Sequence, residues 1–133
     1  MLDINKNKKF YPKGRNTNDE DLEEISNLIK PLPVRRDLLI EYLHLIQDKY
    51  GAIRKKHLAA ISDILKIPFA ESFEVATFYA HFDVIEDNDP SIQDITIRVC
   101  DSLTCELFGS EKLISSLSKN LDKKKVRVVR APC

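Results

Sequence analysis

The sequence predicts an α+β protein in which a bundle of helices precedes a strand–helix–strand unit. Three observations carry this prediction. Apolar residues recur at helical spacing between positions 18 and 82, β-branched runs begin at Ile95 and Val126, and one amphipathic helical stretch separates these two runs. Two such strands form a βαβ unit when they pair in parallel, and the crossover is then almost always right-handed.

The chain begins with an arm, residues 1–17, that we expect to be disordered. It holds five basic residues against the single acid Asp3, and too few apolar groups to form a core. A short helix is predicted next, over residues 18–30, with Asn18 as its cap and Pro31 at its end.

Three further helices are predicted over residues 37–50, 55–66 and 69 to about 79, because apolar side chains repeat at helical spacing in each. Gly51 supplies the left-handed residue that ends the first of them. The last is apolar on more than one face, so we expect it to contact neighbours on two sides. Residues 18–82 together are predicted to form a compact helical bundle.

Residues 83–94 are predicted to be an acidic surface linker, since they hold five acidic residues, no basic residue and one proline. Beyond them, apolar and polar residues alternate from Ile95 to Cys100, as in a half-buried strand. A helix is predicted from about Ser110, and a second strand from Val126. The inward-facing side chains of this helix are expected to be Leu113, Ile114, Leu117 and Leu121.

Composition and charge describe an ordinary globular protein, with 43% hydrophobic residues and 21 basic against 21 acidic residues. No basic field indicates a nucleic-acid partner. No apolar run approaches the ~20 residues of a membrane span, and the polar N-terminus lacks a signal-peptide core, so we expect a cytoplasmic protein without direct membrane insertion. In that reducing compartment three cysteines are expected to be free or metal-bound.

The three cysteines, Cys100, Cys105 and Cys133, sit at or just past the ends of the two predicted strands. Ligand groups converge at strand ends in α/β folds, and thiolates are preferred by iron–sulfur clusters, zinc and copper(I). The Cys-x4-Cys spacing matches neither the Cys-x2-Cys knuckle of zinc sites nor a thioredoxin-type dithiol. Spacing alone leaves three interpretations open: an iron–sulfur site, a zinc site, or unliganded structural thiols.

The remaining aromatic and imidazole groups are interpreted as structural. His44, His57 and His81 are expected at the surface or in packing contacts, rather than as a fourth ligand. Phe78, Tyr79 and Phe82 are assigned to the core, with a docking surface at the helix end as the alternative.

Two separated motifs resemble the 2Fe-2S protein family that includes the E subunit of NADH-quinone oxidoreductase (complex I). The run Val-Cys-Asp-Ser-Leu-Thr-Cys, residues 99–105, is similar to the first half of the family's cluster motif. The run Val-Ala-Thr-Phe-Tyr, residues 75–79, is similar to the signature that ends its helical bundle. The resemblance covers residues 35–133. The same family includes the gamma subunit of NAD-dependent formate dehydrogenase and the equivalent subunit of NAD-reducing hydrogenase.

This resemblance implies a thioredoxin-like α/β domain over residues 95–133 and a 2Fe-2S cluster with Cys100, Cys105 and Cys133 as ligands. It implies an electron-transfer subunit of an NAD(H)-dependent dehydrogenase complex that catalyses no bond chemistry itself. The implied partner is a flavoprotein that carries FMN and an NAD(H) site. The implied place is the cytoplasm, or the cytoplasmic face of a membrane complex.

The sequence also departs from the family pattern. The family completes its cluster site with Cys-x3-Cys, whereas this sequence ends on Cys133, so the fourth ligand is absent and the thioredoxin-like domain is partial. We therefore expect a truncated chain whose cluster needs a thiol from a partner or from solution. Glu74 replaces a glycine of the family, and the segment from Cys105 to Cys133 is short for it.

Two functions of other classes remain as alternatives. A structural zinc module or thiol-rich interaction domain would hold metal without a redox role. A thioredoxin-like thiol enzyme would need a reactive Cys100, but the absence of Cys-x-x-Cys counts against it.

Overall fold

The structure is a computed structural model, and it describes residues 17–131. The chain divides into two compact units, Met1–Asp89 and Pro90–Cys133, which we call unit 1 and unit 2. The boundary between them falls within the segment 83–94 that the sequence indicated as a linker. The arm predicted over residues 1–17 lies outside the described residues, apart from Thr17.

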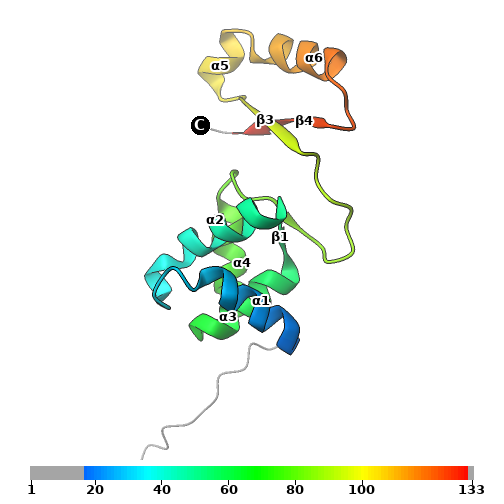
Figure 1. Cartoon of the computed structure of the whole chain (residues 1–133). Helices are drawn as coiled ribbons and strands as arrows, with labels where there is room; N and C mark the ends of the chain where they lie inside the picture. The colour runs from blue at the N-terminus through cyan, green and yellow to red at the C-terminus, as the bar shows by residue number, and fades with distance from the viewer. Residues whose placement is uncertain (1–16, 132–133) are drawn as a thin grey trace, which may run out of the picture. The chain divides into compact units, whose positions relative to one another are not determined.

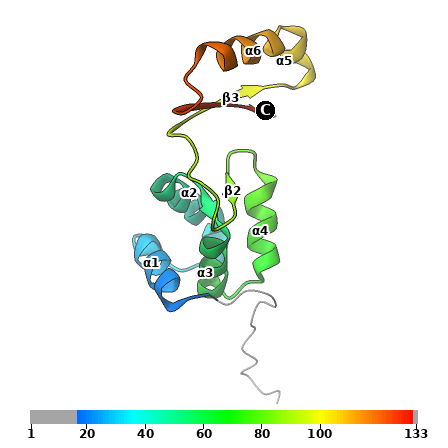
Figure 2. The ribbon, with the colours of Figure 1, turned by 90° about the vertical axis from the view of Figure 1, so that its right-hand side faces the viewer.

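Unit 1 is mainly helical (Figure 1). Helix α3 packs between α1 and α4, while α2 contacts both α1 and α4 (Figure 2). Two very short strands, β1 and β2, pair in parallel beside the helices. In chain order the elements are α1 (Asp19–Ile29), a 3-10 turn η1 (Arg36–Leu38), α2 (Leu39–Tyr50), β1 (Ile53–Arg54), α3 (Lys55–Leu65), α4 (Phe69–Phe78) and β2 (Val84–Ile85).

The core of unit 1 gathers apolar side chains from all four helices, at the positions that the helical spacing predicts. Each fully buried aliphatic side chain contributes about 1.5–3 kcal/mol relative to exposure, so this cluster is the main source of the unit's stability. Ser62 and Ser72 are also fully buried, and their hydroxyl oxygens lie 2.8 Å apart between α3 and α4. The core includes Ile25, Ile29, Tyr42, Leu43, Ile46, Ile53, Leu58, Ile61 and Ala76.

Asn18 and Gly51 are predicted to cap the start of α1 and the end of α2, and only Gly51 caps its helix as predicted. Gly51 adopts the left-handed conformation (φ 73°), and its N–H donates to the Gln47 carbonyl at 2.7 Å, which confirms the predicted end of α2. Asn18 does stand at the start of α1, but its side chain makes no capping hydrogen bond. The expected side-chain cap is therefore wrong, since only the Asn18 carbonyl accepts an N–H, from Leu22 at 3.1 Å.

Hydrogen bonds hold the segment after α4 against α2 and β1. The Gln47 side chain donates to the His81 carbonyl at 2.7 Å and accepts the Asp83 N–H at 2.6 Å. The Asp83 carbonyl in turn accepts the Ile53 N–H at 2.8 Å. These bonds position β2, a strand inside the predicted linker, because Gln47 supplies both a donor and an acceptor to the backbone just before the strand.

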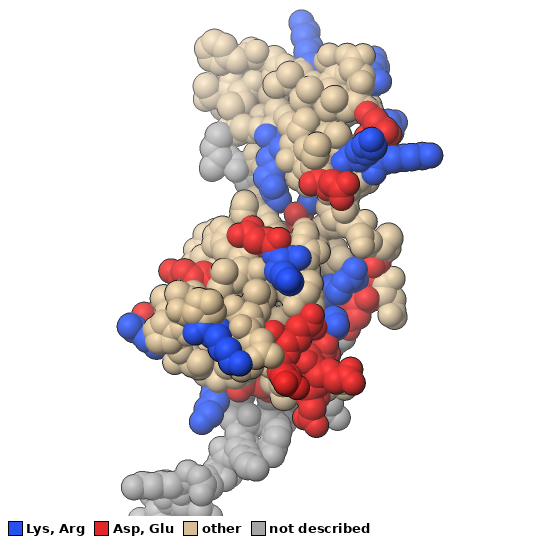
Figure 3. Space-filling view, in the orientation of Figure 1, with Lys and Arg blue, Asp and Glu red and all other residues tan. Residues whose placement is uncertain are grey.

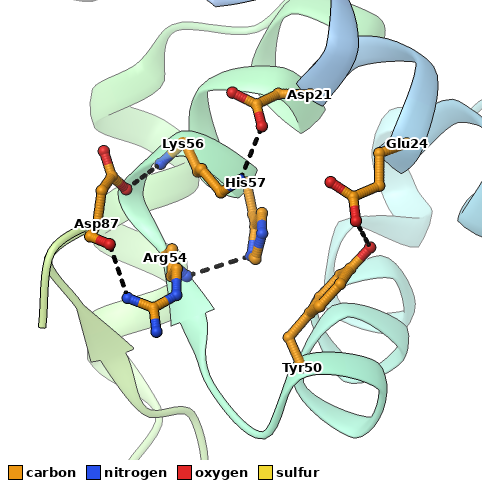
Figure 4. Close-up of polar contacts among 7 residues, drawn as sticks. All are labelled: Asp21, Glu24, Tyr50, Arg54, Lys56, His57 and Asp87. Carbon is orange, nitrogen blue, oxygen red and sulfur yellow. Dashed lines mark hydrogen bonds and ion pairs between the residues drawn. The ribbon is translucent and has the colours of Figure 1, made fainter. Parts of the chain in front are cut away.

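A polar cluster fixes the loop after β2 to the start of α3 (Figure 4). The Arg54 guanidinium donates from one nitrogen to the backbone carbonyls of Glu86, Asp87 and Asp89 at 3.0, 2.9 and 3.0 Å. The Asp87 carboxylate accepts the backbone N–H of Lys56 at 2.9 Å, which satisfies an amide at the N-terminus of α3. Half of the acidic segment is thereby part of unit 1.

Removing this guanidinium is expected to release the loop. Arg54→Met keeps most of the apolar stem but leaves three carbonyls without their charged donor, so we expect a loss of about 1–3 kcal/mol in the free energy of unfolding. Amide hydrogen exchange over residues 86–89 should rise. Arg35→Met is the matched control, because Arg35 forms an exposed ion pair with Asp37 and should cost less than about 1 kcal/mol. Equal effects of both changes would contradict the assigned role.

Acidic side chains gather where α1 lies on the face of unit 1 shown in Figure 3. Asp19, Glu20 and Asp21 fill the first turn of that helix. Carboxylates are favourable there because the helix dipole leaves a partial positive charge at the N-terminus. The Asp21 carboxylate also accepts a hydrogen bond from the Lys56 ammonium at 2.9 Å, which links α1 to α3.

Unit 2 is a parallel βαβ arrangement, and the predicted α+β class is confirmed. Strands β3 and β4 pair in parallel with Ile95 opposite Val126 and Cys100 opposite Ala131. Helix α6 contacts both strands. In chain order the elements are β3 (Ile95–Cys100), α5 (Leu103–Leu107), α6 (Ser110–Asn120) and β4 (Val126–Ala131).

Two paired strands offer a helix only a narrow surface, and this limits burial in unit 2. Val99 is buried, at 8% exposure, whereas Leu113 on α6 is 50% exposed. The prediction that Leu113 faces inward is therefore wrong, while Ile114 and Leu117 on the same helix are half-buried. None of the helices in residues 17–131 has the length and apolar character needed to cross a membrane.

Candidate metal centre

Cys100 is the last residue of β3 and is half-buried. The strand places it directly beside Ala131, the last residue of β4. Both strands run the same way, so their carboxyl ends meet at one edge of unit 2, as the sequence predicted. Cys133 follows Ala131 by two positions and lies outside the described residues.

Cys105 lies on a helix rather than in a loop. The sequence predicts no helix between Cys100 and about Ser110, but Leu103–Leu107 form α5, with Cys105 at its centre. The signal that was missed is Ser102, a residue type favoured at helix starts, followed by Leu103, Glu106 and Leu107, which are good helix formers. Cys105 is half-buried, like Cys100.

The turn after α5 depends on Gly109. Its φ of 97° lies in the left-handed region that glycine adopts without strain, and its N–H donates to the Glu106 carbonyl at 3.0 Å. This turn lets α6 begin at Ser110, directly after α5, so that it covers the strands. The glycine therefore contributes to the fold of the thiol-bearing segment.

Ser102, one of the residues that the sequence offers as a hydrogen-bonding group beside Cys100, contacts this first thiol directly. Its hydroxyl oxygen lies 3.0 Å from the Cys100 sulfur. On the neighbouring strand, Arg130 donates to the Glu111 carboxylate at 2.6 Å, and this hydrogen bond raises the pKa of Arg130. The charges of Asp101 and Glu106 act on Arg130 in the same direction.

Large apolar side chains on the same short segment as Cys105 are exposed at the surface of unit 2. Leu103, Leu107 and Phe108 are 75%, 80% and 89% exposed. They lie within three positions of Cys105 in the sequence, and most of their apolar surface is in contact with water. Exposed large apolar side chains are typical of surfaces that contact other molecules.

The chemistry of these donors fits a soft metal centre. Thiols are the ligands that iron–sulfur clusters require, and Cys100 and Cys105 belong to one short segment. Within residues 17–131, no three side chains of the His, Cys, Asp and Glu types come together as a metal site. The described residues therefore contribute two thiols, and a four-ligand centre would need two further ligands.

Unit 1 has a surface groove with exposed aromatic side chains. An open groove of about 710 Å³ lies along α4, and Phe78 and Tyr79 on its rim are 80% and 42% exposed. The core assignment is thus wrong for Phe78 and right for Phe82, which is buried. The rings of His81 and His44 lie 5.0 Å apart between centroids at a tilt of 44°, which is a packing contact at the surface.

A parallel strand–helix–strand unit with a thiol pair at the carboxyl end of its first strand is the arrangement expected of a thioredoxin-like iron–sulfur protein. The comparison with protein families agrees with this class. The chain belongs to the thioredoxin-like [2Fe-2S] ferredoxin family, whose model matches residues 25–130.

Similar proteins of known function are components of redox complexes. The chain is 38% identical over 99 residues to the E subunit of NADH-quinone oxidoreductase from Buchnera aphidicola subsp. Baizongia pistaciae, covering 74% of this chain and 55% of the relative. It is 36% identical over 93 residues to the corresponding E subunit of Aquifex aeolicus, covering 70% and 55%. It is 24% identical over 98 residues to the NADP-reducing hydrogenase subunit HndA of Solidesulfovibrio fructosivorans, covering 74% and 54%. The chain thus spans about half the length of these relatives.

Proposed function

We propose that this chain is an iron–sulfur electron-transfer subunit of an NAD(P)H-dependent redox complex. The observation that carries the proposal is the thiol pair Cys100 and Cys105 at the carboxyl end of β3, in a chain of the thioredoxin-like [2Fe-2S] ferredoxin family. The names of the relatives support the kind of complex. Within such a complex the chain carries electrons and makes or breaks no substrate bond.

Cys100, Cys105 and Cys133 are proposed as three ligands of a 2Fe-2S cluster, which supplies one-electron redox chemistry when bound. Ala131 is the register partner of Cys100, and Cys133 follows Ala131 by two positions in the sequence. A cluster held by four thiolates needs one ligand more than the 133 residues carry. We propose that this ligand is a thiol outside these residues.

The partner we propose is a flavoprotein that carries FMN and an NAD(H) site. The exposed apolar residues Leu103, Leu107 and Phe108 beside Cys105 support contact with another protein at this edge. The cluster ligands must remain thiolates, which supports a reducing compartment such as the cytoplasm.

The test is anaerobic reconstitution with iron and sulfide, followed by visible absorption and EPR spectroscopy. The 133-residue chain is compared with a form extended by three residues and a cysteine, and with a matched form extended by three residues and a serine. We expect a reducible 2Fe-2S signal in the cysteine-extended form, and its loss in the Cys100→Ser and Cys105→Ser variants of that form. Zinc without iron in every form would overturn the electron-transfer role and favour a structural zinc module.

A further inference from the structure

The contact between Ser102 and Cys100 has geometric causes in the local backbone. Ser102 is still extended, with φ −67° and ψ 160°, although α5 begins at the next residue. Along extended chain, side chains two positions apart point to the same side. The Ser102 hydroxyl oxygen therefore lies above the Cys100 sulfur, at 3.0 Å.

Ser102 occupies the position where a serine would ordinarily cap the helix. A capping hydroxyl accepts an N–H from the second or third residue of the helix. Here the Ser102 carbonyl accepts the Glu106 N–H at 2.9 Å, but the side chain makes no capping hydrogen bond and is turned toward Cys100 instead. The Ser102 side chain therefore contacts the Cys100 sulfur and does not cap α5.

We propose that the Ser102 hydroxyl donates a hydrogen bond to the Cys100 sulfur, orients this ligand, and raises the reduction potential of the cluster. The hydrogen bond concerns the protein alone, whereas the effect on the reduction potential rests on the proposed function above. A thiolate sulfur has only acceptor capacity, so the hydroxyl must be the donor once Cys100 is a ligand. Ser102 is then a positioning residue that acts through Cys100.

The direction of the effect follows from charge. One-electron reduction adds negative charge to the cluster and its thiolates, and a hydrogen bond to a sulfur stabilises the form with more negative charge. Loss of the donor destabilises the reduced form more than the oxidised form. The midpoint potential without the hydroxyl must therefore be more negative.

The experiment uses three variants of the cysteine-extended chain. Ser102→Ala removes the hydroxyl, Ser102→Thr keeps it on an exposed residue where a methyl group fits, and Thr104→Ala removes a hydroxyl from the same segment. No hydrogen bond joins the Thr104 side chain to another described residue. Redox titration followed by EPR should give a more negative midpoint for Ser102→Ala, and midpoints close to the parent for Ser102→Thr and Thr104→Ala.

A second measurement tests the hydrogen bond without any metal. In the metal-free 133-residue chain with Cys105→Ser and Cys133→Ser, Cys100 is the remaining thiol, and its S–H stretching band is isolated in the Raman spectrum. Ser102→Ala should shift this band, and Ser102→Thr should restore it. An unmoved band would overturn the contact.

The outcomes separate this proposal from the proposed function. A cluster that forms with an unchanged potential in Ser102→Ala would overturn the effect of Ser102 and leave the electron-transfer role intact. Absence of a cluster from every form would overturn both the electron-transfer role and the effect on the potential. In that case the Raman band still decides whether Ser102 bonds to Cys100.

Discussion

Tyr42→Ala is expected to lower the free energy of unfolding of unit 1 by about 3–5 kcal/mol, the cost of removing a large aromatic side chain from a packed core. Tyr42 on α2 is fully buried. Its hydroxyl donates to the Pro33 carbonyl and accepts the Arg35 N–H at 3.1 Å, so it also fixes the segment between α1 and α2. The variant therefore loses packing and leaves two backbone groups without their partner.

Urea unfolding followed by circular dichroism measures this effect. Tyr42→Phe separates the two contributions, since it keeps the ring and should cost about 1–3 kcal/mol through the lost hydrogen bonds. Tyr79→Ala is the control, because Tyr79 is 42% exposed on the rim of the groove and should cost far less. A neutral Tyr42→Phe would show that the hydroxyl contacts do not stabilise the fold.

Lowering the pH from about 7 to about 5 is expected to destabilise the protein by about 2 kcal/mol through His57 alone. His57 is buried near the start of α3, where its Nδ1 accepts the Arg54 N–H at 3.3 Å and its ring lies 4.5 Å from that of Tyr50 (Figure 4). Burial lowers its pKa from 6.5 to about 4, and the Lys56 charge adds to this effect. Nearby Glu24 and Asp21 oppose the shift only in part.

The direction of this change in stability follows from proton binding by His57. Above pH 6.5 the histidine is neutral in both states, so its contribution to stability is fully present. Between pH 6.5 and about 4 the unfolded chain binds a proton that the folded chain does not, and stability falls as the pH falls.

His57→Gln is the matched variant for this prediction. It keeps an acceptor for the Arg54 N–H and does not titrate, so its unfolding midpoint in urea should change much less between pH 7 and pH 5. Parallel pH profiles of the two proteins would mean that His57 is not the titrating group.

Much of unit 1 could be predicted from the sequence because its information is local. Helical spacing of apolar residues gave α1 to α4 to within a few residues, and Gly51 marked the end of α2. Alternation gave β3 and placed Cys100 at its end. The resemblance of two motifs to an iron–sulfur family is confirmed by the family match over residues 25–130.

Other features depend on residues that are distant in sequence. Strand β2 exists because Gln47 and Ile53 bond to the backbone around Asp83, and no pattern within residues 83–94 indicates this. Leu113 and Phe78 lie on apolar helix faces, yet both are exposed because too little structure covers those faces. Exposure depends on what lies opposite, which periodicity does not encode.

The sequence by itself determined the fold class, and through the resemblance of two motifs the family, since hydrophobic period, glycine and proline positions and short motifs are properties of residues close together in the chain. Tertiary structure decided the local contacts: Cys105 on the short helix α5, the Ser102 hydroxyl beside the Cys100 sulfur, and the hydrogen bonds of Arg54 to the acidic segment of unit 1. A hydrogen bond needs two groups within about 3 Å, and only the folded backbone sets that distance.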